Sequence, residues 1–177
     1  MPATYTTIST TTLTSAQSSV TLSSIPSNYT DLILTCSLRA TASTFNNVNF
    51  IEPSFNGDTT SGLYSLSGLF SRTGTITSPG NANANNLRGV TAIATSDMAS
   101  DIFSHFTMNL MSYSNTSVFK TVLCRSATGG NLTAMDDVWT TVGMWRNTTA
   151  INSIRFVPSA GNFATGSTFT LYGIKSA

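Results

Sequence analysis

Charged residues are scarce in this sequence. Only 8% of its 177 residues are Asp, Glu, Lys or Arg, whereas an average soluble domain carries about 25%. Several residue types that favour helices are almost missing, since the chain has one Glu, one Gln and two Lys. In their place stand 31 Thr, 26 Ser and 15 Asn. Thr suits pleated strands, while Ser and Asn suit turns, so the composition predicts an all-β fold.

The same scarcity argues against several classes of partner. The six Arg residues are scattered and the formal net charge is +1, so the chain has no basic cluster for nucleic acid. No apolar run approaches the roughly 20 residues that a membrane helix needs. The first residues, MPATYTTIST, lack the pattern of a signal peptide. Because 40% of the residues are hydrophobic, the chain can still bury a core and is not expected to be disordered.

Catalytic and metal-binding residue patterns are equally hard to find. His105 is the single histidine, and no G-x-S-x-G motif accompanies it. The seven acids show no paired arrangement of the kind used for glycoside hydrolysis; they are Asp31, Glu52, Asp58, Asp97, Asp101, Asp136 and Asp137. Zinc-ligand spacing, the EF-hand pattern and phosphate-binding glycine loops are absent as well. A loop calcium ion near Asp136 and Asp137 is the one metal site left open. We therefore predict a protein that is not an enzyme and has no cofactor.

The two cysteines, Cys36 and Cys124, are too few for a disulfide framework. Both lie in strand-like segments, LILTCSL and FKTVLCR. Buried free thiols are the usual outcome in such segments, with a single disulfide between neighbouring strands as the alternative.

Alternating apolar and polar residues recur between turn sequences such as Asn56-Gly57. They predict eleven strands, over 4–9, 18–24, 31–39, 48–56, 62–72, 87–95, 102–113, 117–126, 137–147, 151–157 and 167–175. Segment 78–86 reads as an exposed mobile loop, and 97–103 is the one candidate for a helical turn. This count favours a jelly-roll-type two-sheet β-sandwich with extra strands over a Greek-key immunoglobulin sandwich, because no Trp lies between the cysteines. Residues 1–17 form an N-terminal arm or edge strand, and 18–177 a single domain.

Some predicted strands are apolar on both faces, although only one face of a sandwich strand packs inward. In strand 137–147, Val138, Val142 and Met144 oppose Trp139 and Trp145. Either loops or a third layer cover the second faces, or these faces contact another subunit or a partner. The candidate interface residues are Phe103, Met111, Phe119, Leu123, Trp139 and Trp145.

Three segments carry a resemblance to a known family. YTTISTTTLTSAQSSVTLSSIPSNYTDLILTCSLRA, SFNGDTTSGLYSLSGLF and IRFVPSAGNFATGSTFTLYGIKSA together resemble small virion structural proteins of tailed phages, especially phages of cyanobacteria. Relatives often have the sequence R-F-N-G-D, whereas this chain has Ser54 in place of the arginine and Pro53 before it. The resemblance implies a sandwich carried on the virion and hands over no site residues.

Two functions follow as expectations. The first is a capsid decoration (cement) protein on the capsid surface, a homotrimer whose partners are itself and the major capsid protein. The polar arm 1–17 is then a candidate docking strand. The alternative is a carbohydrate-binding tail-fibre or adhesin module for host attachment, with a host surface glycan as its ligand. Its aromatic platforms would be Tyr64, Tyr113, Trp139 and Trp145, near the loop amides Asn83, Asn85 and Asn86.

Overall fold

The computed structural model describes residues 4–43, 49–72, 74–129 and 137–175. Within these residues the chain is all-β and contains no helix. Its strands are β1 (Tyr5–Thr12), β2 (Val20–Leu22), β3 (Asp31–Leu38), β4 (Asn49–Phe50), β5 (Ser54–Phe55), β6 (Tyr64–Arg72), β7 (Thr75–Thr77), β8 (Gly80–Ala84), β9 (Ala92–Ile93), β10 (Ser104–Met111), β11 (Lys120–Thr128), β12 (Asp137–Trp145), β13 (Ile154–Phe156) and β14 (Thr168–Ile174).

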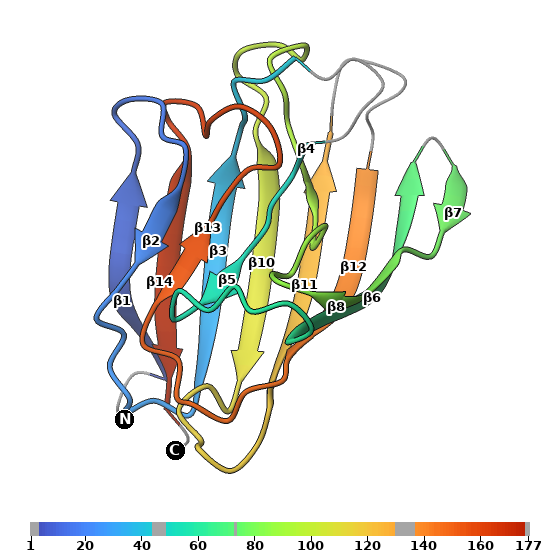
Figure 1. The fold of residues 1–177 in the computed structure, drawn as a ribbon. Helices are drawn as coiled ribbons and strands as arrows, with labels where there is room; N and C mark the ends of the chain where they lie inside the picture. The colour runs from blue at the N-terminus through green and yellow to red at the C-terminus, as the bar shows by residue number, and fades with distance from the viewer. Residues whose placement is uncertain (1–3, 44–48, 73, 130–136, 176–177) are drawn as a thin grey trace.

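One large antiparallel sheet forms the frame of the molecule (Figure 1). Its strand order is β1-β14-β3-β10-β11-β12-β6-β7, and β8 pairs with β6 beside β7. The first and last long strands, β1 and β14, are neighbours, so the two ends of the described chain lie side by side at one edge.

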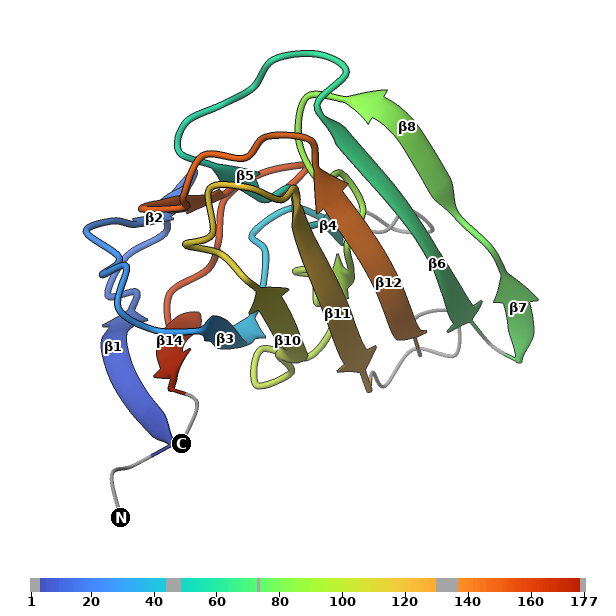
Figure 2. The ribbon, with the colours of Figure 1, turned by 90° about the horizontal axis from the view of Figure 1, so that it is seen from below.

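A smaller layer covers one face of this sheet (Figure 2). It consists of the three-stranded sheet β2-β13-β5, the pair β4-β9 and their connecting loops. The core fills the space between the two layers. We call the covered side of the large sheet its inner face and the opposite side its outer face.

Alternation along the strands selects the core residues. In β3, Leu32, Leu34, Cys36 and Leu38 are buried while the residues between them are partly exposed, as the sequence pattern predicts. Aromatic rings fill the wider part of the interlayer space. Trp145 contacts Phe55 and Tyr64 with ring centroids 5.6 and 6.2 Å apart.

The predicted β-sandwich is confirmed at the level of an all-β fold of packed antiparallel sheets. Its jelly-roll form is not confirmed, because nine strands belong to one large sheet. The predicted helical turn at 97–103 is wrong: two separate turns occur there, closed by Met98 N–H to Thr95 O and Ile102 N–H to Ala99 O. The predicted loop at 78–86 is also wrong in part, because Gly80–Ala84 forms β8 by pairing with β6.

Cys36 and Cys124 are buried free thiols. They lie on β3 and β11, which β10 separates, and strands two apart stand about 9–10 Å from each other. A disulfide needs Cα atoms within about 7 Å. Burial raises the pKa of both thiols, that of Cys124 to about 12, and the neighbouring Cys124 raises the pKa of Cys36 further.

We expect iodoacetamide to leave the native protein unlabelled at about pH 8, because the thiolate is the reactive species and neither thiol ionises there. Mass spectrometry should find two labels only after denaturation. Rapid labelling of either cysteine in the native protein would contradict this placement.

Since the folded pKa values are raised, these thiols contribute stability that is lost as the pH rises above about 9.

Candidate docking face and aromatic pocket

The outer face of the large sheet exposes a group of large aliphatic side chains. Leu69 on β6, Ile76 on β7, and Val138 and Val142 on β12 are 57%, 74%, 60% and 53% exposed. We call these four residues the aliphatic patch. Large apolar side chains that gather on adjacent strands are uncommon on a protein that meets only water.

Strand register surrounds the patch mostly with neutral residues. Thr140 lies opposite Leu69, and Val142 lies opposite Ser67 and Leu123. Val138 faces Ala127 and Ser71. Arg125 of the neighbouring strand β11 is exposed on the same face and lies directly opposite Thr140, the residue between Val138 and Val142. Covering the patch would therefore leave Arg125 at its margin, where a long side chain can keep its charge in water.

Shallow hollows follow the patch along the sheet. One of about 200 Å³ lies among Leu69, Ser71, Ile76, Val138 and Thr140. A second of about 220 Å³ lies between β6, β11 and β12 and is lined in part by Val142 and Met144. Such relief gives protruding side chains of a partner places to insert.

The predicted interface residues are divided by the structure. Met111 and Leu123 lie on the outer face and line a further hollow of about 260 Å³ with Ile33 and Ile174. Phe119 is exposed just before β11. Phe103 is half-buried beside Gly166, in the turn before β14. Contact between these residues and a partner stays a prediction.

The placement of Trp139 and Trp145 on the exposed second face is wrong. They are 3% and 1% exposed and belong to the inner face, while Val138 and Val142 of the same strand point outward. The sequence separates these two sets correctly but does not show which one points inward. The small layer decides it: Phe50 of β4 contacts Trp139 and Phe55 of β5 contacts Trp145, while Phe70 and Tyr64 of β6 stack on the same indoles within the large sheet.

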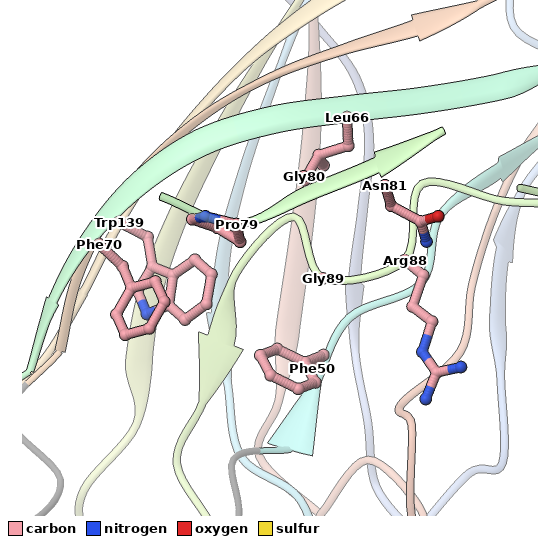
Figure 3. A pocket seen from close by; sticks show the side chains of 9 residues that line it. All are labelled: Phe50, Leu66, Phe70, Pro79, Gly80, Asn81, Arg88, Gly89 and Trp139. Carbon is pink, nitrogen blue, oxygen red and sulfur yellow. The ribbon is translucent and has the colours of Figure 1, made fainter. Parts of the chain in front are cut away.

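Trp139 lines a pocket of about 260 Å³ at the margin of the inner face, shown in Figure 3. Phe70 stacks on its indole with centroids 4.3 Å apart, and Phe50 meets it edge-on at 5.7 Å. Pro79, Gly80 and Asn81 supply a wall from β8 and the residue before it. Arg88 and Gly89 come from the turn after β8.

The polar groups of this pocket are few. Arg88 is largely exposed and stands 3.4 Å from the Glu52 carboxylate, which also accepts a hydrogen bond from the Asn86 amide at 3.2 Å. The indole N–H of Trp139 is buried and has no hydrogen-bond partner. A buried donor without an acceptor is costly, so a ligand or water oxygen that reached it would be stabilised there.

Three of the four aromatic residues expected to form sugar platforms cannot do so in this fold. Tyr64, Tyr113 and Trp145 are fully buried in the core. Of the expected amides, Asn83 accepts a hydrogen bond from Arg146 and Asn86 donates to Glu52, whereas Asn85 is exposed. Asn81, which sequence reasoning did not single out, is the amide that lines the pocket.

Several of the ionisable residues form structural contacts, and the single histidine lies at the surface. His105 is exposed on β10 between Ser37 and Ala127. Asp137 forms two hydrogen bonds with Arg72, and Asp58 accepts one from Trp145. Among the described residues no three His, Cys, Asp or Glu side chains group to hold a metal ion. The calcium site considered at Asp136 and Asp137 falls partly outside them, since residue 136 is not described.

The described part of the chain has no helix long and apolar enough to cross a membrane. No family model matches the chain, and no curated protein and no solved structure matches it either.

Proposed function

We propose that this chain is a non-enzymatic virion structural protein, a capsid decoration protein that braces the major capsid lattice. The observation that carries the proposal is the exposed aliphatic patch on the outer face. The resemblance of the sequence to small virion proteins of tailed phages supports the same function. In this proposal the outer face is the docking surface and the capsid surface is the location; the homotrimer expected from the sequence stays a prediction.

Physical chemistry favours such a surface for bracing. Burying apolar area contributes roughly 25 cal/mol per Å² to the free energy of binding. The four side chains of the aliphatic patch would supply such area in one contact. Hydroxyl groups around the patch, such as Ser67, Ser71 and Thr140, offer neutral hydrogen bonds. Neutral groups lose less on leaving water than charges do. A protein that spans a seam between capsid subunits adds contact area that the seam itself lacks.

Substitution V142K should weaken binding to undecorated capsids at least about tenfold, or about 1.4 kcal/mol, because it buries an unpaired ammonium in an apolar contact. Titration of purified capsids with labelled protein would measure the change. The fold should tolerate the substitution, since Val142 is exposed. The matched control is T21K, at an exposed site on β2 in the small layer, which should bind as the unmodified protein does. If V142K binds capsids as tightly as the unmodified protein does, the outer face is not the docking surface.

The pocket beside Trp139 supports a second candidate, the carbohydrate-binding module of a tail fibre or adhesin. An aromatic wall with Asn81 and Arg88 at its mouth combines the apolar and polar contacts that sugars use. In this version the ligand is a host surface glycan. The buried indole N–H of Trp139 would gain a hydroxyl oxygen as acceptor.

Nitrogen–proton correlation spectra would test this second candidate directly. The two indole N–H signals report different sites, because that of Trp145 already donates to Asp58 while that of Trp139 has no acceptor. A glycan that occupies the pocket should shift the Trp139 signal and leave the Trp145 signal in place. A glycan array without any binding, together with unchanged spectra, would remove this candidate.

A further inference from the structure

Among the described residues, strand β1 has a pairing partner on one side only. It is the end strand of the large sheet, and its ladder is formed with β14 (Figure 1). Its eight residues are exposed or half-buried throughout. An edge of this length is a ready template for another strand unless the sequence protects it.

Two of the usual protections, charge and proline, are missing from β1. Its sequence, YTTISTTT, contains no charged residue and no proline. At the opposite edge the sheet ends instead in two short strands, β7 and β8, of three and five residues, with Pro79 between them. The one irregularity of β1 is a bulge between Thr7 and Ser9, which leaves Ser9–Thr12 as regular strand.

We propose that β1 pairs antiparallel with β1 of a second copy of this chain, about a two-fold axis. In such a pair the residue on the axis meets itself, and residues on either side of the axis meet each other in reverse order, so a charged side chain on the axis would face its like. The uncharged composition of β1 satisfies this requirement. A partner of a different sequence would place no such restriction on the strand.

Threonine makes the self-pairing favourable. Thr10 already donates its hydroxyl to that of Thr170 on β14 at 3.4 Å, and the row continues through Thr35 to Thr107 on β3 and β10. A pairing centred on Thr11 sets Thr10 of each copy opposite Thr12 of the other. The threonine row would then run unbroken across the axis, and Thr–Thr pairs stabilise antiparallel strands.

Light scattering during size-exclusion chromatography tests the inference. The full chain should elute at micromolar concentration with twice the mass of one 18.7 kDa chain. The double variant T10K/T12K places like charges around the axis and should halve the mass. Both positions are exposed, so the fold should persist. The matched control T140K, exposed on the central strand β12, should remain a dimer. Docking through the outer face is a separate contact, so T140K can lose capsid binding while it keeps this dimer.

A single cysteine locates the axis. T11C should form a covalent dimer under mild oxidation, whereas T140C should not, because β12 lies several strands away from β1 in the sheet. Cys36 and Cys124 are buried and cannot take part. A monomer of the unmodified chain, or the homotrimer predicted from the sequence, would overturn the inference. A dimer that T10K/T12K does not dissociate would also overturn it, since another surface would then hold the copies together.

Discussion

Substitution R72M is expected to lower the free energy of unfolding by about 3–5 kcal/mol, the usual effect of leaving a buried charge without its partner. The Asp137 carboxylate is almost fully buried and takes two hydrogen bonds from the Arg72 guanidinium, at 2.7 and 2.8 Å. These bonds raise the pKa of Arg72 above its ordinary value, against the lowering effect of burial. The pair joins the end of β6 to the start of β12, next to Trp139 and Val138.

Denaturant titration monitored by circular dichroism would measure this loss. The double variant R72M/D137L should recover much of the stability, because a buried ion pair can be replaced by apolar side chains of similar volume. R155M, on the exposed side of β13, is the matched control and should change stability by no more than about 0.5 kcal/mol. A loss below about 1 kcal/mol for R72M would show that the pair contributes no more than a surface ion pair does.

Substitution W145A should cost a similar amount, about 3–5 kcal/mol, because it opens a large cavity in a close-packed core. The indole contacts Phe55 and Tyr64, and its N–H donates to the Asp58 carboxylate at 3.0 Å. W139A is the informative comparison. Trp139 borders an open pocket that water can fill, so we expect the smaller loss there.

W145A should also change how the free energy of unfolding depends on pH below neutrality. Burial tends to raise the pKa of Asp58, but hydrogen bonds from Thr60, Trp145 and Asn147 outweigh it and hold the pKa below its ordinary value. A lowered folded pKa contributes stability that is lost as the pH falls through that pKa. Unfolding midpoints measured from neutral pH down to about pH 3 should therefore fall less steeply in W145A. Parallel curves for the two proteins would contradict this role of the indole.

The sequence predicts most of the large sheet because its strands obey local rules. Alternation marks β3, β10, β11 and β12 within a few residues of their observed ends, and the Asn56-Gly57 turn adopts the positive φ angles of 52° and 69° that such a pair favours. Strand β8 escapes prediction because GNANA has no apolar face. It becomes a strand only through hydrogen bonds to β6, a partner that lies outside any local window.

Burial direction is the other limit of the sequence. Lys120 is fully buried, although lysine is almost always exposed. Its ammonium donates to the carbonyl oxygens of Asn115 and Val118, in the segment just before β11, and of Thr148, after β12. In β12 the same ambiguity affects the proposed docking face: both sets of alternating residues include large apolar side chains, and only the contacts of Phe50 and Phe55 in the small layer with Trp139 and Trp145 show which set faces the core.

Imaging of purified phage particles by cryo-electron microscopy is the most direct test of the proposed function. If this chain braces the capsid, its density should appear at icosahedral positions on the capsid. Leu69, Val138 and Val142 of the outer face should then be turned toward the major capsid protein. Density confined to the tail, or copies on the capsid whose outer face points into solvent, would contradict it.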